Sequence, residues 1–384
     1  MNTIKFPIEK FQRLDTPFYY YDTALLDATL DAAKAAAEGL ARIHYAVKAC
    51  ANPKILGRIA RAGFGADCVS GGEITAAIKA GFAPADIVFA GVGKSDREIR
   101  TALEAGIGCF NVESRPELEN IGRIAVEMGR TARVAFRINP DVDAHTHAKI
   151  TTGKAENKFG IAMDDMVQAI RTAESLEGVE YEGLHFHIGS QILETAPFEQ
   201  LALRINELQD RLEAEGIRTA SINVGGGLGI DYDAPDEHPV PDFQAYFDTF
   251  RRTLRLRPHQ ALHCELGRSI TGQCGSLIAR VLYVKQTATK QFAILDAGMT
   301  ELVRPAMYGS LHAMQNLTSD RPAETYDIVG PVCESSDVFG KNYPLAGTVR
   351  GDFVALRSAG AYGEAMASCY NCRPLPQACF SDEL

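Results

Sequence analysis

The sequence predicts an α/β protein in which a (β/α)8 TIM-type barrel is followed by a mostly-β domain. Two observations predict this fold. Between residues 40 and 265, eight short strand-like runs alternate with segments of helical periodicity, and such alternation produces parallel strands that close into a barrel. After Glu265 the helical pattern weakens, and short β-branched or aromatic runs are separated by turn residues.

The barrel strands are predicted from short runs that come at intervals along the chain. They are Arg42–Val47, Gly65–Val69, Asp86–Ala90, Gly108–Val112, Ala132–Ile138, Glu180–His187, Ala220–Val224 and Ala261–Glu265. Helices are predicted where apolar residues recur every three or four positions. These segments are Pro53–Arg61, Glu73–Lys79, Asp96–Glu104, Pro116–Met128, Met163–Ala173, Phe198–Glu213 and Phe243–Leu254.

The second domain is predicted to be a β-sandwich or barrel-like unit. Its strand-like runs include Leu277–Tyr283, Phe292–Leu295, Thr325–Val329 and Asp352–Leu356. The N-terminal run Phe18–Tyr21 is also strand-like and precedes an alanine-rich helix, so we expect it to join this domain. The expected boundaries are 25–265 for the barrel, and 1–24 with 266–384 for the mostly-β domain.

Composition argues against several classes of protein. The net charge of −10 does not favour nucleic-acid binding, and no apolar run reaches the length of a membrane span. The opening residues lack the apolar core of a signal peptide. The nine cysteines are odd in number and scattered, which indicates free thiols. We therefore expect a cytoplasmic protein with no nucleic-acid or membrane partner.

Cys369 and Cys372 have the C-x-x-C spacing found in zinc and redox sites. Structural zinc sites normally need four ligands, and no second pair of cysteines or histidines lies nearby in the sequence. The pair is a weak signal, and no metal is predicted.

Polar or glycine residues stand at the C-terminal end of nearly every predicted barrel strand. In chain order they are Lys48, Asp67, Gly91, Glu113, Arg137 with Asn139, His187 with Ser190, Gly225–Gly227, and Glu265 with Arg268. Barrel enzymes place their chemistry at these ends. Packing alone does not explain the pattern, so the sequence predicts an active site at this rim.

His185 and His187 lie two residues apart on a predicted strand, so their side chains point to the same face. The strand then runs into a loop of small polar residues that includes Ser190. Two imidazoles in this position indicate a site, although satisfied core histidines would produce the same pattern.

Gly225, Gly226 and Gly227 directly follow the seventh predicted strand. Glycines allow backbone N–H groups to approach an anion, and barrels often bind phosphate in the loops after strands seven and eight. The next loop adds Gly267 and Arg268. A tight turn without a ligand would also account for the glycines.

Lys48 ends the first predicted strand. It is either a surface lysine with a buried stem or an amine poised for Schiff-base chemistry. A lysine, an anion site, a flat imidazole and a carboxylate near an arginine together match the needs of pyridoxal phosphate. That cofactor requires an imine partner, a phosphate site, a stacking face and a partner for its pyridine nitrogen.

Seven ordered motifs resemble the diaminopimelate decarboxylase family, within the fold III, alanine-racemase-like pyridoxal-phosphate enzymes. They are Tyr45–Ala49, Gly65–Glu73, His185–Gln191, Gly225–Gly229, Glu265–Ser269, Cys333–Asp337 and Gly360–Gly363. The resemblance extends from about Thr16 to Asn371. It implies decarboxylation of meso-2,6-diaminopimelate to L-lysine and CO2, the last step of lysine biosynthesis.

The resemblance also implies which residues hold the cofactor. Lys48 would bind it covalently, His187 would stack on its ring, and Glu265 would face the pyridine nitrogen. The phosphate would be bound by Gly225, Gly226 and Gly227, by the backbone of Gly267 and Arg268, and by the Tyr362 hydroxyl. Asp67, Arg137 and Ser190 complete the expected cofactor contacts.

For the substrate, the resemblance implies that Arg268, Arg304, Tyr308 and Tyr362 line the binding site. Guanidinium groups suit bidentate recognition of the carboxylate at the far end of the substrate, although Arg304 alone would be taken for a surface residue. Glu334 would bind the far ammonium group. Cys333 would supply a proton to the carbanion from the neighbouring subunit, which implies a homodimer with shared active sites.

Cys50 and Leu266 depart from the family pattern, which usually has Asn and Pro at these positions. We hypothesise that Leu266 loosens the turn before Gly267, because proline would fix φ there. We also hypothesise that Cys50 makes the site sensitive to oxidation, because it places a thiol near Lys48.

Three alternatives remain open. The first is a related decarboxylase of ornithine, arginine or carboxynorspermidine, against which Arg304 and Glu334 argue. The second is a metal-dependent hydrolase on the same barrel, but such enzymes carry their His-x-His pair on the first strand. The third is a cofactor-binding regulator without activity, which the presence of both Lys48 and Cys333 disfavours.

Overall fold

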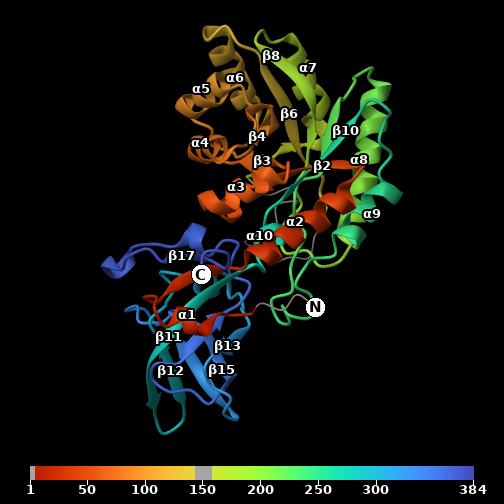
Figure 1. Ribbon diagram of the computed structural model, residues 1–384. Coiled ribbons are helices and arrows are strands. Elements are labelled where there is room, and N and C mark those ends of the chain that lie inside the picture. The colour runs from red at the N-terminus through yellow and green to blue at the C-terminus, as the bar shows by residue number, and fades with distance from the viewer. Residues whose placement is uncertain (1–4, 143–157) are drawn as a thin grey trace. The chain divides into compact units, whose positions relative to one another are not determined.

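The computed structural model describes residues 5–142 and 158–384 (Figure 1). The chain forms two compact units. The barrel unit comprises Leu30–Gly229 and Asp242–Gly267, and the β unit comprises Met1–Thr29, Ile230–Pro241 and Arg268–Leu384.

Eight parallel strands of the barrel unit pair in the order β5-β4-β3-β2-β10-β9-β8-β6, and pairing of β5 with β6 closes the barrel. Their bounds are Ala41–Ala46 (β2), Gly65–Cys68 (β3), Ile87–Phe89 (β4), Cys109–Val112 (β5), Ala132–Asn139 (β6), Val179–His185 (β8), Ser221–Asn223 (β9) and Ala261–Leu266 (β10). A short strand β7 (Ile161–Ala162) pairs with β6. The predicted barrel and its eight strands are confirmed, with ends that shift by one or two residues.

Helices separate most of these strands along the chain (Figure 1). They are α2 (Thr23–Ala37), α3 (Pro53–Arg61), α4 (Gly71–Ala80), α5 (Asp96–Ala105), α6 (Arg115–Glu127), α7 (Met166–Ser175), α8 (Ala196–Ala214) and α9 (Phe243–Thr253). Side-chain caps fix where several of them begin. Ser95 and Glu98 form a reciprocal capping box at the start of α5, and Ser70 and Ser114 cap α4 and α6.

The interior of the barrel contains polar side chains where such barrels usually pack branched apolar ones. The buried polar residues on the strands include His44, Asp67, Asn111, His185, Asn223 and Glu265. Buried polar groups require hydrogen-bond partners, so these strands must align their side chains closely. This requirement fixes the geometry of the candidate site.

The β unit contains one sheet in the order β13-β16-β11-β12-β14-β15, and β1 pairs with both β11 and β17. The strands are Phe18–Tyr21 (β1), Gly275–Gln286 (β11), Gln291–Leu295 (β12), Met314–Asn316 (β13), Ala323–Val329 (β14), Val338–Ala346 (β15), Phe353–Leu356 (β16) and Gln377–Phe380 (β17). Short helices are α1 (Ile8–Phe11), α10 (Arg268–Thr271) and α11 (Arg304–Tyr308). The N-terminal strand therefore joins the mostly-β domain, as predicted.

Strand β15 was not predicted, because Gly340, Asn342 and Pro344 within it are typical of a loop. It forms because it pairs antiparallel with β14, and the register shifts where the irregular residues lie.

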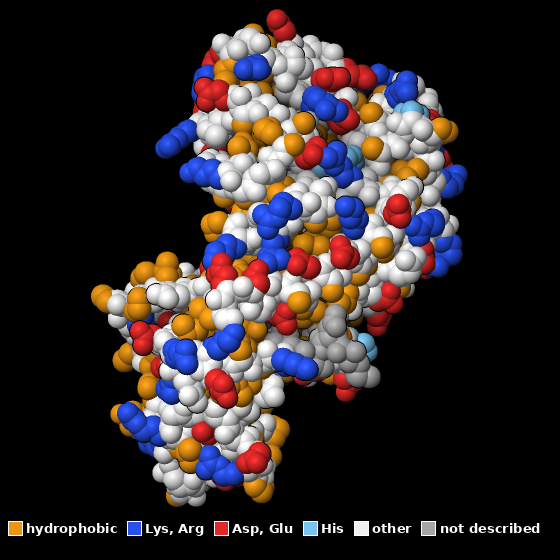
Figure 2. Space-filling model, in the orientation of Figure 1, with side chains coloured by type: hydrophobic (Ala, Val, Ile, Leu, Met, Phe, Trp, Pro, Cys, Tyr) orange, Lys and Arg blue, Asp and Glu red, His pale blue; other side chains and the backbone are white. Residues whose placement is uncertain are grey.

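On the face drawn in Figure 2, acidic and basic side chains are interspersed. Within residues 5–142 and 158–384, no helix combines the length and the apolar character that a membrane span requires.

We expect the interior histidine His44 to make the fold sensitive to acid. Its Nε2 lies 2.9 Å from Nδ1 of His263, and burial, together with repulsion from His263, lowers the pKa of His44 to about 3. In the unfolded chain the pKa of this histidine has its ordinary value of 6.5, so the unfolded chain binds a proton more tightly than the folded protein does. The free energy of unfolding therefore decreases as the pH falls from 6.5 towards 3.

His44→Gln should therefore weaken the pH dependence of unfolding by up to about 1.4 kcal/mol per pH unit in this window. Urea unfolding at a series of pH values measures this slope, and His259→Gln at an exposed position is the matched control. An unchanged slope in His44→Gln would show that this imidazole does not remain neutral in the folded protein.

Candidate active site

Lys48 lies just beyond β2, in the short 3-10 turn Val47–Ala49, and its ammonium points towards a buried carboxylate. Its Nζ lies 2.9 Å from Oδ2 of Asp67 on β3, whose side chain is fully buried. Burial raises the pKa of Asp67, Glu265 adds to this effect, and the charge of Lys48 opposes it. Because the Lys48 side chain is 38% exposed, its amine is both held in place and open to a ligand.

Glu265 lies near the end of β10 and accepts hydrogen bonds from three other strands. Its Oε2 is 2.9 Å from Nε2 of His185, and its Oε1 accepts from Asn111 at 3.0 Å and from Asn223 at 2.8 Å. Burial alone would raise the pKa of Glu265, but His185 and Lys48 hold it well below its usual range. A buried carboxylate is thus kept ionised in the middle of the barrel.

The two histidines of the sequence motif have different partners. Strand β8 ends at His185, which is buried against Glu265, whereas His187 lies in the following loop. Nδ1 of His187 accepts a hydrogen bond from the Gly226 backbone at 3.3 Å. Burial, with the nearby charges of Arg137 and Lys48, lowers the pKa of His187 well below its usual value, so its ring is neutral.

The glycines after β9 allow close approach of neighbouring strands. A Cβ on Gly225 would lie 2.2 Å from the Phe186 carbonyl oxygen, and one on Gly226 would lie 2.1 Å from that of Glu265. Gly225 and Gly227 also have positive φ values of 70° and 120°. The tight turn is therefore required by the barrel itself, and its role in phosphate binding stays a prediction.

Asn223 joins this turn to Glu265. Its amide nitrogen donates to Glu265, and its oxygen accepts from the Gly225 backbone at 2.9 Å. Gly267, which follows β10, also lies in a crowded place, because a Cβ there would lie 3.0 Å from that of Ala46.

Arg137 on β6 forms a buried ion pair with Glu113, at 2.8 Å. Glu113 also accepts from the Gly160 backbone, and the Arg137 guanidinium lies 4.5 Å from the centre of the Phe159 ring. The charge of Arg137 is thus balanced within the protein. Ser190 lies in the loop after β8 and is partly exposed.

The β unit brings together the predicted residues Arg268, Arg304, Tyr308 and Tyr362, and adds Tyr232. The Arg304 guanidinium lies 5.5 Å from the Tyr308 ring centre, 5.7 Å from that of Tyr362 and 5.9 Å from that of Tyr232. Arg268 donates to the Tyr232 hydroxyl at 2.6 Å and lies 4.9 Å from the Tyr362 ring centre. We call these five residues the arginine–tyrosine cluster.

Arg304 is a buried cation, and the residue is 7% exposed. In the described part of the chain its Nε has no hydrogen-bond partner, and no carboxylate pairs with its guanidinium. Burial lowers the pKa of Arg304. Because an uncompensated buried cation is costly, the arginine–tyrosine cluster indicates a site for an anionic ligand.

Cys333 and Glu334 lie in the loop between β14 and β15, and both are exposed. The loop is held by Asp337, which accepts from the Val332 and Met299 backbones at 2.7 and 2.6 Å. These two residues belong to the β unit, as does the arginine–tyrosine cluster.

The two departures from the family pattern lie in buried places. Cys50 is 1% exposed, which limits the access of an oxidant to its thiol. Leu266 is the last residue of β10, where it pairs with Tyr45, so it does not lie in the turn that we expected it to loosen.

Asn111, Asn223 and Tyr232 were missed by the sequence reasoning. The two asparagines stand inside short strands, where nothing in the sequence distinguishes them from ordinary buried amides. Tyr232 follows the glycine turn closely, and that position was the only signal it offered.

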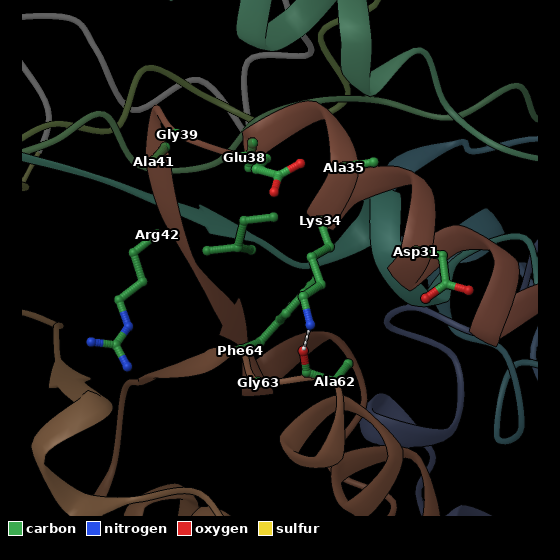
Figure 3. Close-up of a pocket in the computed structure, with 12 residues that line it drawn as sticks. Asp31, Lys34, Ala35, Glu38, Gly39, Ala41, Arg42, Ala62, Gly63 and Phe64 are labelled. Atoms are coloured by element: carbon green, nitrogen blue, oxygen red, sulfur yellow. Dashed lines mark hydrogen bonds between the residues drawn. The ribbon is translucent and has the colours of Figure 1, made fainter.

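Two further features could form functional sites, a hollow on the barrel unit and clusters of metal-binding side chains. A hollow of about 440 Å³ on the barrel unit is bordered by charged side chains that include Asp31, Lys34, Glu38 and Arg42 (Figure 3). Lys34 donates across it to the Ala62 carbonyl at 3.1 Å. Among the described residues, no three His, Cys, Asp or Glu side chains gather in a way that could hold a metal ion.

Comparison with known proteins identifies the relatives of this chain. The family model "Pyridoxal-dependent decarboxylase, pyridoxal binding domain" matches residues 25–272. A diaminopimelate decarboxylase of Bacteroides thetaiotaomicron is 62% identical over 381 residues, which cover 99% of each chain. One of Zymomonas mobilis is 43% identical, over 94% of this chain and 86% of that protein.

Similar solved structures are also diaminopimelate decarboxylases. The diaminopimelate decarboxylase of Helicobacter pylori, complexed with L-lysine, superposes with a TM-score of 0.92 at 40% identity, covering 98% of this chain and 94% of that one. The enzyme of M. jannaschii, in co-complex with L-lysine, gives a TM-score of 0.90 at 36% identity, covering 97% and 89% of the two chains.

We expect His185 to stabilise the barrel through its hydrogen bond to Glu265. His185→Leu removes a donor from a buried carboxylate and should lower the free energy of unfolding by about 3 kcal/mol. His185→Gln, which retains an N–H donor, should lose much less. Urea unfolding without added cofactor measures both values, and equal losses in the two variants would contradict the assignment.

Proposed function

The chain belongs to the diaminopimelate decarboxylases, a family of pyridoxal-dependent decarboxylases, and within that family we propose that it converts meso-2,6-diaminopimelate to L-lysine and CO2. The reaction is a carboxy-lyase step that ends lysine biosynthesis. The observation that carries the proposal is the set of charged groups at the barrel rim, where Lys48 and Asp67 form an ion pair and Glu265 stays ionised.

The residues of the barrel rim fit pyridoxal 5'-phosphate, the cofactor of this family. Lys48 offers an accessible amine, Glu265 an ionised carboxylate and His187 a neutral flat ring. Oδ1 of the buried Asp67 and Nδ1 of His185 have no hydrogen-bond partner in the described part of the chain, which leaves polar capacity for a ligand. We propose that Gly225–Gly227, with the backbone of Gly267 and Arg268 and the Tyr362 hydroxyl, hold its phosphate.

When bound, pyridoxal phosphate supplies an aldehyde that combines with amines and a ring that accepts the electron pair left by departing CO2. The proposed contribution of Glu265 is a negative charge beside the pyridine nitrogen, which favours protonation there. Lys48 would hold the cofactor through its amine, and Asp67 would orient that lysine. His187 would support the face of the ring. Arg137 and Ser190 complete the proposed contacts.

The proposed substrate accounts for the unpaired cation of the β unit. A diaminopimelate molecule carries a second carboxylate at its far end, and we assign it to Arg268, Arg304 and Tyr308. Ornithine and arginine lack such a carboxylate, so a decarboxylase of these amino acids, the principal alternative, would leave the Arg304 guanidinium without its counter-charge. Glu334 is assigned to the far ammonium group.

We propose that Cys333 supplies the proton that replaces the lost carboxyl group. Its exposed position, beside the equally exposed Glu334, supports an arrangement in which both residues serve the site of a neighbouring subunit. The protein would then be a homodimer with shared active sites. We also propose a cytoplasmic location, because all nine cysteines are free thiols and the cytoplasm keeps thiols reduced.

Absorption spectroscopy with parallel CO2 detection tests the proposed reaction. The purified protein should show an absorption band at about 420 nm that shifts when meso-diaminopimelate is added, with release of CO2 and lysine. Lys48→Ala should lose this band and essentially all turnover. CO2 release from ornithine or arginine, but not from diaminopimelate, would favour the alternative decarboxylase, and turnover by Lys48→Ala would disprove the assignment of the lysine.

Mixing two inactive variants tests the shared site. Lys48→Ala and Cys333→Ala subunits should together regain about a quarter of the wild-type activity, because about half of the dimers are hybrids with one intact site of two. Each variant alone is the control. If subunit exchange is demonstrated and no activity returns, each site is built from a single chain.

A further inference from the structure

The tripeptide Tyr370-Asn371-Cys372 contacts the exposed turn that carries Cys333 and Glu334. The Cys333 backbone N–H donates to Oδ1 of Asn371 at 3.1 Å. The Tyr370 hydroxyl donates to Oε1 of Glu334 at 2.7 Å, and this bond raises the pKa of Tyr370 and so preserves the donor. Two consecutive residues of one turn therefore hold two consecutive residues of another.

The tripeptide is held in an unusual conformation. Asn371 and Cys372 have φ values of 54° and 58°, in the left-handed region that non-glycine residues rarely adopt. Such a conformation costs about 1 kcal/mol or more per residue and persists where surrounding contacts maintain it. Asparagine tolerates this region better than most residues, which fits its presence at position 371.

Both turns rest on the same segment, Gly298–Glu301. On the side of the tripeptide, Arg373 pairs with the buried Glu301 at 3.3 Å, and the Ser368 N–H donates to the Thr300 carbonyl at 2.9 Å. On the side of Cys333, Asp337 accepts from the Met299 N–H at 2.6 Å. The common base sets the distance between the two turns.

We propose that Tyr370 and Asn371 are positioning residues, of which Asn371 fixes the backbone of the proton-donating Cys333 and Tyr370 orients Glu334 towards the far ammonium group of the substrate. This inference rests on the proposed function, because it assumes the roles given there to Cys333 and Glu334. Cys369 and Cys372, the C-x-x-C pair of the sequence, flank the two residues that make these contacts.

Kinetics of single variants separate the two roles. Tyr370→Phe removes only the hydroxyl and should raise KM for meso-diaminopimelate about threefold to tenfold, with little change in kcat.

Asn371→Gly tolerates the positive φ but lacks the acceptor, and should lower kcat about tenfold with little change in KM. Asn371→Asp, which retains the oxygen, should recover most of kcat. Cys369→Ser is the matched control and should behave as wild type.

Hydrogen exchange gives a readout that does not depend on activity. In the protein without added substrate, the Cys333 amide should exchange faster in Asn371→Gly than in wild type, and Asn371→Asp should restore its protection. Unchanged exchange at Cys333 would overturn the inference. The inference would also be overturned if both variants showed a lower kcat, a higher KM and a lower melting temperature. That pattern indicates general loosening of the fold.

Cys333→Ala and Glu334→Gln distinguish failure of the inference from failure of the proposed function. If these two variants are impaired while Tyr370→Phe and Asn371→Gly match wild type, the positioning role is wrong and the proposed function stands. If Cys333→Ala and Glu334→Gln themselves match wild type, the function assigned to this turn is wrong, and the inference falls with it.

Discussion

The structure of the barrel depends on one buried carboxylate, that of Glu265. Removing an ionised Glu265 from water is costly, and the protein offsets this cost with donors from His185, Asn111 and Asn223. Each donor stands on a different strand, so the carboxylate can stay charged only when the strands are in register. The polar interior thus links closure of the barrel to the charge that the proposed chemistry needs.

The two units differ in how their buried charges are compensated. In the barrel unit, charges are balanced inside the protein, as in the pairs Lys48–Asp67 and Arg137–Glu113. In the β unit, none of the described carboxylates pairs with the buried Arg304. Balanced charges suit a resident cofactor that must be held in one orientation, whereas an unbalanced cation suits an anionic substrate that binds and leaves.

The strands of the barrel could be predicted because their alternation with helices is a local pattern that recurs eight times. The rim residues followed from that pattern, since strand ends define the rim. The hydrogen bonds of Asn111 could not be predicted, because they depend on which strands face each other across the barrel. Strand β15 was missed for a related reason: pairing with β14 overrides loop-like residues such as Pro344.

If the proposed substrate carboxylate binds to the buried guanidinium of Arg304, substrate binding also stabilises the folded protein. An anion that binds there binds only to folded molecules, and it raises the free energy of unfolding by about 2.7 kcal/mol at a concentration 100-fold above Kd. Fewer molecules are then open to proteases. Under this proposal, the lifetime of the protein in the cell would depend on the supply of its substrate.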